Sequence, residues 1–149
     1  NVFVKVPISF TNGETTSSVI KHLIDKEIKL NITAIFTLKQ IKEIFSIIKD
    51  TETILSVFAG RLFDIGIDAV SSMKEISSFI KEESNCKLLW ASPRMIYDIK
   101  SSLDSNSDII TIQYNLLKKL NLFGLHPEEY SLDTVKMFYQ DALSSNYKI

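Results

Sequence analysis

Several features that mark particular protein classes are scarce in this chain of 149 residues. The single cysteine, Cys86, allows neither an internal disulfide bond nor a thiolate cluster. Two histidines, His22 and His126, are too few and too far apart in the sequence for a zinc site. The four glycines form neither a Gly-x-Gly-x-x-Gly pattern nor another phosphate-cradling loop. We therefore expect no metal, and a barrel is favoured over a nucleotide-binding doubly wound fold.

Charge and hydropathy argue against two further classes. The net charge is −1, whereas a dedicated nucleic-acid binder would be strongly basic. No apolar stretch approaches the roughly 20 residues of a membrane span. The length suits one domain with a real core, and no low-complexity linker is present. We predict a single domain over residues 1–149 that binds neither nucleic acid nor membrane. Because no signal peptide is evident, although the first residue is not methionine, we predict a cytoplasmic location.

The most informative local feature is a lysine within an apolar, β-branched run. Lys5 lies in the middle of Val2–Pro7, a segment typical of a buried strand. An unpaired buried charge is costly, so such a lysine is either paired or kept neutral. A neutral lysine is a nucleophile that can form a Schiff base with a carbonyl group. The simpler alternative is a lysine at a strand edge that extends to solvent.

Apolar β-rich runs alternate with amphipathic helical patterns along the sequence. The expected strands are Val2–Pro7, Lys29–Ala34, Thr53–Phe58, Lys87–Ala91 and Asp108–Gln113. They are short and apolar on both sides, as expected for strands covered on both faces. A last helix is expected over Leu132–Leu143, with Val135, Phe138 and Ala142 buried.

This alternation predicts an α/β fold of parallel βαβ units. A complete (β/α)8 TIM barrel typically needs about 250 residues, which is more than this chain has. Five strands in an open sheet would leave two unpaired edges. Two interpretations therefore stay open, an open sheet or the C-terminal five βα units of a barrel.

Polar residues gather where the expected strands end, which is where βα barrels place their catalytic residues. They are Lys5, Asn31, Thr33, Ser56, Arg61, Ser92 and Arg94. Only two of the 17 basic residues are arginines, and both occur here. Two guanidinium groups on successive βα loops could converge on one anion. Alternatively, Arg61 could pair with Asp64 or Asp68.

The residues after the fourth expected strand, Ser92 to Arg94, also resemble a helix start. Ser92 could be an N-cap residue, with Pro93 at the first helical position. Arg94 would then lie in the first turn, where a cation opposes the helix dipole. This placement argues for a bound anion near Arg94.

Several separated motifs resemble, in the same order, those of the transaldolase family, which includes the fructose-6-phosphate aldolase-like enzymes. The motifs are Val4–Pro7 followed by Gly13, Leu30–Phe36 with Gln40, Ser56–Arg61, and Ala91–Arg94. The resemblance covers most of the chain. It implies a class I aldolase on an α/β barrel, of which this sequence would supply strands four to eight and the C-terminal helix.

The resemblance also implies roles for individual residues. Lys5 matches the Schiff-base lysine, and Asn31 and Thr33 match the pair that positions substrate hydroxyls and the catalytic water, so Lys5 and Thr33 are the expected catalytic residues. The expected substrate-binding residues are Asn31, Ser56, Phe58 and Ser92. Phe58 replaces a tyrosine common in aldolase-type members, which favours transaldolase.

The phosphate-binding residues implied by the resemblance are Arg61 and Arg94, with Ser92 beside the second arginine. Pro93 departs from the family, where an aromatic residue is common. An aspartate on strand one and a glutamate on strand three complete proton transfer in the family, and neither has a counterpart here. We therefore expect this chain by itself to be weakly active or inactive.

The implied function is transfer of a dihydroxyacetone unit between sugar phosphates, as in the pentose phosphate pathway, with no cofactor. One alternative is a fructose-6-phosphate aldolase-like enzyme. Another is a non-catalytic fragment or pseudoenzyme that binds sugar phosphates. A third is a homo-oligomer in which a partner subunit supplies the missing strands.

Overall fold

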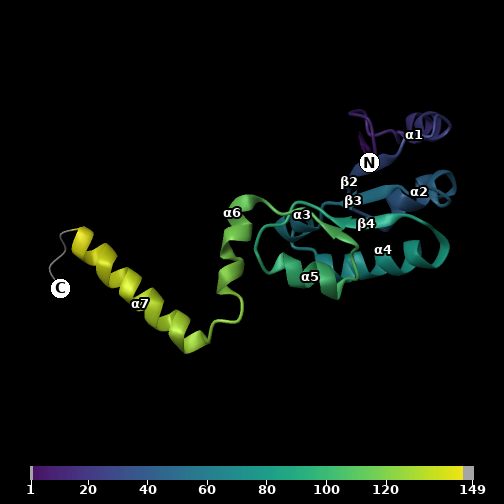
Figure 1. The fold of residues 1–149 in the computed structure, drawn as a ribbon. Helices are drawn as coiled ribbons and strands as arrows, with labels where there is room; N and C mark the ends of the chain where they lie inside the picture. Colours follow the sequence, from purple (N-terminus) through teal and green to yellow (C-terminus); the bar gives the residue numbers. More distant parts are fainter. Residues whose placement is uncertain (1, 146–149) are drawn as a thin grey trace. The chain divides into compact units, whose positions relative to one another are not determined.

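The computed structural model describes residues 2–145 of the chain, which fall into two compact units (Figure 1). The first unit extends to Leu117 and contains a five-stranded sheet with its helices. The second begins at Lys118 and contains a short 3-10 helix followed by one long α-helix. Each unit is described separately below, and the single domain expected over residues 1–149 stays a prediction.

The first unit is an α/β structure with a parallel sheet. Its strands are β1 (Val4–Pro7), β2 (Leu30–Ile35), β3 (Ile54–Val57), β4 (Lys87–Trp90) and β5 (Ile109–Ile110), paired in that order. Its helices are α1 (Ser17–Ile24), α2 (Leu38–Ile48), α3 (Ala59–Asp64), α4 (Ala69–Glu83), α5 (Asp98–Asp104) and α6 (Tyr114–Leu117). Sequential parallel strands with intervening helices are the arrangement of a partial TIM barrel. The expected fold class is confirmed, although the strand expected over Asp108–Gln113 is reduced to two residues.

Local sequence explains where the two longest helices of this unit begin. Before α2, the Thr37 hydroxyl accepts the backbone N–H of Gln40, and the Gln40 side chain accepts the N–H of Thr37. Before α4, a carboxylate oxygen of Asp68 accepts the N–H groups of Val70 and Ser71. Hydrogen bonds from Ser71 hold the pKa of Asp68 below its usual value. These caps satisfy N–H groups that a helix start leaves unpaired.

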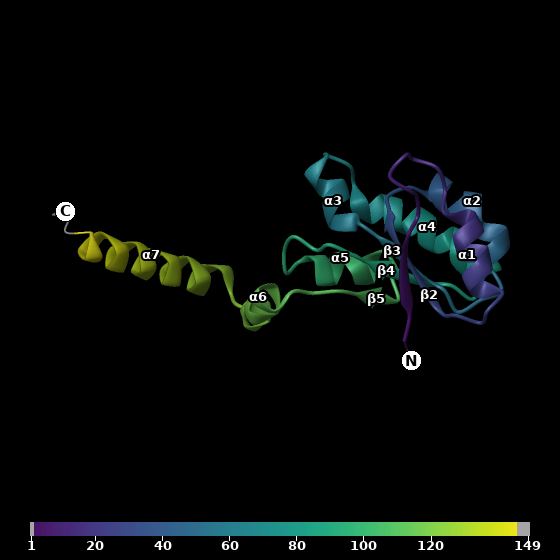
Figure 2. The same ribbon diagram turned by 90° about the horizontal axis from the view of Figure 1, so that it is seen from above.

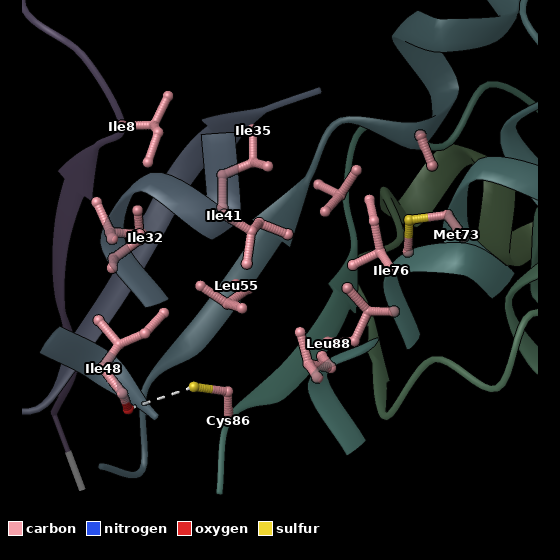
Figure 3. Packing of buried hydrophobic residues seen from close by; sticks show 14 of the residues in the cluster. Ile8, Ile32, Ile35, Ile41, Ile48, Leu55, Met73, Ile76, Cys86 and Leu88 are labelled. Atoms are coloured by element: carbon pink, nitrogen blue, oxygen red, sulfur yellow. Dashed lines mark hydrogen bonds between the residues drawn. The ribbon is translucent and has the colours of Figure 1, made fainter. Parts of the chain in front are cut away.

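One face of the sheet packs against helices and forms the core. Helices α1, α2 and α4 lie on the same side of the sheet (Figures 1 and 2). Alternate strand residues such as Ile32 and Leu55 point to this side and meet Ile41 and Ile76 (Figure 3). The opposite face carries polar residues in β1, β2 and β3. Burial on both faces, as expected, holds for β3 and β4, whose consecutive residues are buried, but not for the edge strand β1, where Lys5 is exposed.

Cys86 belongs to this core rather than to a reactive site. Its thiol is buried, and its Sγ donates a hydrogen bond of 3.5 Å to the carbonyl of Ile48 (Figure 3). Burial raises the pKa of the Cys86 thiol, because a thiolate would lose its hydration there.

The helix start expected at Ser92 and Pro93 is wrong. Ser92 has a φ of 60°, which is a left-handed conformation, and α5 begins only at Asp98. The Asp98 carboxylate accepts the N–H groups of Arg94 and Met95 at 2.6 and 3.0 Å. These hydrogen bonds hold the segment before α5 as a turn, so Arg94 lies in a βα loop.

The second unit contains a 3-10 helix (Lys118–Leu122) and α7 (Pro127–Ser144). Helix α7 includes the helix expected over Leu132–Leu143 and begins earlier, because proline at a first helical position is favourable. The expected burial is wrong, since Val135 and Phe138 are exposed and Ala142 is only half-buried. None of the helices within residues 2–145 is both long and apolar enough to cross a bilayer.

We predict that truncation of the core at β2 destabilises the chain far more than the same chemical change at the surface. Ile32 is fully buried, whereas Ile65 is 65% exposed. Ile32→Ala should lower the free energy of unfolding by about 2–5 kcal/mol, because it removes buried methyl groups and leaves a cavity. Ile65→Ala should change it by about 0.5 kcal/mol or less. Urea unfolding of both variants measures this, and equal losses would contradict the assigned core.

Candidate active site at the carboxyl ends of the strands

Strand register places three of the predicted site residues on one face of the sheet. Lys5 is paired in register with Asn31, and Asn31 with Ile54. Parallel neighbours lie about 4.8 Å apart, so the Lys5 and Asn31 backbones are adjacent. Ser56, two residues beyond Ile54, has its side chain on the same face. Its hydroxyl donates a hydrogen bond of 2.6 Å to the Asn31 Oδ1 atom.

This hydrogen bond orients the amide of Asn31. Because Oδ1 accepts from Ser56, the two N–H donors of the amide stay available for another acceptor. Ser56 is only 2% exposed, so its hydroxyl is held in place by the surrounding sheet. The pair is suited to binding a hydroxyl or carbonyl oxygen of a small polar ligand.

The prediction that Lys5 is buried is wrong, because its side chain is exposed among the described residues. Lys5 lies on β1, which is an edge strand of the sheet. Its neighbour Val6 points to the opposite side and is buried in the core. The strand pattern in the sequence is therefore correct, but only one of its two faces is shielded from water.

Thr33 lies two residues after Asn31, on the same face of β2. Its hydroxyl oxygen is buried and has no hydrogen-bond partner among the described residues. Buried hydroxyl groups normally have a partner, so this hydroxyl can pair with a small bound molecule such as water. The strand is distorted directly after it, where Ala34 has a φ of 59° and the register with β3 shifts.

Phe58 and Arg61 follow β3 as expected. The Arg61 guanidinium carbon lies 5.0 Å from the centre of the Phe58 ring, a cation–π contact. The alternative ion pair of Arg61 with Asp64 or Asp68 is absent from the described residues. The Phe58 ring also contacts Phe36 after β2, at 5.8 Å between ring centres.

Close packing at Gly60 joins the third βα loop to the fourth. A Cβ atom at Gly60 would lie 1.7 Å from the carbonyl oxygen of Ser92 and 3.3 Å from Cγ of Arg94. The Gly60 N–H also donates to the carbonyl of Ala91 at 3.3 Å. The side chain of Arg94 therefore begins beside the residue that precedes Arg61, so the loop that carries Arg94 packs against the start of α3, which carries Arg61.

Two aspartates that the sequence analysis did not select as site residues hold Arg94. Asp98 binds its backbone, and Asp64 binds its guanidinium group. Asp98 is 1% exposed, and its second oxygen, Oδ1, has no partner among the described residues. The four-residue spacing between Arg94 and Asp98 could have indicated this contact in the sequence. Spacing alone, however, does not distinguish a loop contact from a pair on one face of a helix.

Metal ligands do not cluster in the described part of the chain. Among residues 2–145, no three histidine, cysteine, aspartate or glutamate side chains are close enough together to bind a metal ion. The structure brings together Lys5, Asn31 and Ser56 on neighbouring strands, and separately joins the loop of Arg94 to α3, which carries Arg61. Amide, hydroxyl and guanidinium groups are of the kinds that bind a polar ligand with an anionic group.

Comparisons with known proteins agree with this arrangement. The family model described as Transaldolase/Fructose-6-phosphate aldolase matches residues 1–148. A protein of Bdellovibrio bacteriovorus named "Probable transaldolase" is 27% identical over 95% of this chain and 60% of its own length. Another of that name from Bartonella henselae is 31% identical over 80% of this chain and 52% of its own length. The chain thus spans between half and three-fifths of these relatives.

We predict that a methyl group at Gly60 disrupts the contact between the two loops. Gly60→Ala should lower the free energy of unfolding by about 3 kcal/mol, because the Ser92 backbone must move. Gly13→Ala is the matched control, since no atom lies within 4 Å of the new Cβ. Only its positive φ is unfavourable, by about 1 kcal/mol. Chemical denaturation compares them, and equal losses would show that the loops are not closely packed at Gly60.

Proposed function

Because the chain belongs to the transaldolase/fructose-6-phosphate aldolase family, we propose that its strand ends form part of a site for sugar phosphates. The family is one of aldolases and transferases, so the proposed chemistry is transfer of a dihydroxyacetone unit through a lysine Schiff base. The observation that carries the proposal is the row of Lys5, Asn31 and Ser56 beside the two arginine-bearing loops.

In this proposal the arginines bind the phosphate group of the substrate. Arg61 lies in α3, and Arg94 lies on the loop that packs against α3 at Gly60. Guanidinium groups bind phosphate through paired N–H donors, and Ser92 supplies a further polar group on the same loop. The phosphate would thus hold one end of an extended sugar, with its carbonyl end toward β1 and β2.

The proposed covalent step begins at the Lys5 amine. Its Nζ atom attacks the ketose carbonyl carbon, water leaves, and an iminium forms. The C4 hydroxyl then loses its proton to water as the C3–C4 bond breaks, and the electron pair of this bond enters the iminium to give an enamine. An aldose phosphate leaves, and the enamine later adds to the carbonyl of another aldose phosphate, whose oxygen takes up a proton. This addition restores an iminium, which water hydrolyses to free Lys5 and the new ketose phosphate. Thr33 would hold the water that carries protons, because its buried hydroxyl has no partner among the described residues.

A second candidate function is sugar-phosphate binding without turnover by this chain. The exposed position of Lys5 favours it, since exposure leaves the amine in contact with water. The phosphate-binding loops are built independently of β1 and would keep their affinity. The predicted cytoplasmic location, pathway and homo-oligomer stay predictions under either function.

We predict that sodium borohydride traps a fructose 6-phosphate adduct on Lys5, because hydride reduces an iminium to a stable amine. Peptide mass spectrometry should locate the added mass on Lys5 and show its loss in Lys5→Arg. Lys87→Arg, which changes another exposed strand lysine, should keep the adduct. An adduct spread over many lysines, or none, would contradict the Schiff-base assignment and favour binding alone.

We predict that Arg94→Lys weakens fructose 6-phosphate binding about tenfold, because lysine cannot make two parallel hydrogen bonds to phosphate. Isothermal titration of the full chain measures this. Binding of unphosphorylated fructose should be weak in both proteins and insensitive to the substitution. Equal affinity of the two proteins for the phosphorylated sugar would exclude Arg94 from the phosphate site.

A further inference from the structure

We propose that Asp64 is a positioning residue, which holds the Arg94 guanidinium in the orientation that binds the substrate phosphate. This inference rests on the proposed function, and it deepens the account of the phosphate site. It assigns a role to a carboxylate on α3 that neither the sequence motifs nor the strand ends had indicated.

The contact between the two side chains is bidentate. Nε of Arg94 donates to Oδ1 of Asp64 at 3.2 Å, and Nη2 of Arg94 donates to Oδ2 of Asp64. The partners are 30 residues apart in the sequence and come from successive βα loops. Two parallel hydrogen bonds fix the plane of the guanidinium as well as its position.

The donors that remain on Arg94 suit a second anion. A guanidinium group has five N–H donors, of which Asp64 uses one on Nε and one on Nη2. Both N–H groups of Nη1 and one of Nη2 are left. These lie on the end of the fork, so they can donate side by side to two phosphate oxygens. Asp64 therefore orients Arg94 without occupying the edge that phosphate needs.

Arg94 is held at its backbone as well as at its guanidinium. The buried carboxylate of Asp98 accepts the Arg94 N–H at 2.6 Å. With both ends attached, the long side chain loses most of its rotamer freedom before a ligand arrives. A binding group ordered in advance does not lose that entropy on binding, so affinity rises.

Asp64 also attaches Arg94 to the helix that carries the other predicted arginine. Arg61 and Asp64 both belong to α3, three residues apart. The Arg61 guanidinium lies over the Phe58 ring, while Asp64 binds the Arg94 guanidinium. One carboxylate thus connects the loop that carries Arg94 to the helix that carries Arg61.

A role in stability explains this ion pair less well. Both side chains are 46% exposed, and exposed pairs of this kind contribute about 0–1 kcal/mol to folding. Asp64 could also act oppositely, as a competitor that neutralises Arg94 and repels phosphate. Removal of a competitor would tighten phosphate binding, whereas removal of a positioning residue would weaken it. The sign of the change therefore distinguishes the two roles.

The test titrates the full chain with fructose 6-phosphate and follows thermal unfolding in parallel. Asp64→Asn should weaken binding about tenfold, because the amide has one acceptor oxygen and its NH2 group faces the Arg94 donors. Asp64→Glu, which keeps the carboxylate, should recover part of the affinity. Asp104→Asn is the control, since Asp104 is 47% exposed and pairs with Lys100 away from the site. It removes the same charge and should change affinity by less than about twofold.

A double-mutant cycle shows whether Asp64 acts through Arg94. In an Arg94→Met background, Asp64→Asn should cause no further loss of affinity. Unchanged or tighter binding by Asp64→Asn, with fructose 6-phosphate still bound by the unaltered chain, would overturn the positioning role alone. If the unaltered chain binds fructose 6-phosphate no better than fructose, the proposed function fails, and the role of Asp64 fails with it.

Discussion

The parallel register of β1, β2 and β3 is the constraint on which the candidate site depends. It places Lys5 beside Asn31, and it lets Ser56 reach Asn31 from the next strand. Side chains alternate along a strand, so a shift by one residue would move these groups into the core and Val6 out of it. Burial of the alternate apolar residues therefore maintains the site on the opposite face, although those residues contact no ligand themselves.

Hydrophobic packing and polar binding are separated between the two faces of the same sheet. Leu55 faces the helices and is fully buried, while Ser56, the next residue, faces the site. In this way the core stabilises the strands without using the groups that would contact a sugar. The half-buried position of Asn31 and the exposed position of Lys5 show that the second face is only partly covered in the described residues.

The second organising feature is the contact between the third and fourth βα loops. Gly60 allows the Ser92 carbonyl to approach the start of α3, and Asp64 at the end of α3 binds Arg94. Strand register determines the positions of strand residues, but it does not determine how loops meet. The missing Cβ of Gly60 lets the fourth loop approach α3, and the Asp64 carboxylate attaches Arg94 to α3. These two contacts determine where Arg94 lies relative to the helix that carries Arg61.

Much of the first unit could be predicted from sequence because apolar residues recur at different spacings in its strands and in its helices. Alternation within Leu30–Ile35 and helical spacing within Leu38–Ile48 identify β2 and α2, and motif order identified the family. The start of α5 could not be predicted in this way. Ser92 and Pro93 form a favourable local cap, but the Asp98 carboxylate binds the backbone upstream and holds it as a turn.

The sequence by itself determined the α/β class, the approximate strand positions and the residue types at the strand ends, because these depend on local periodicity and composition. Tertiary structure alone decided that Lys5 is exposed, that Asp64 binds Arg94 rather than Arg61, and that Thr33 has a buried hydroxyl without a partner among the described residues. Each of these depends on which distant residues lie nearby, and local sequence does not specify that.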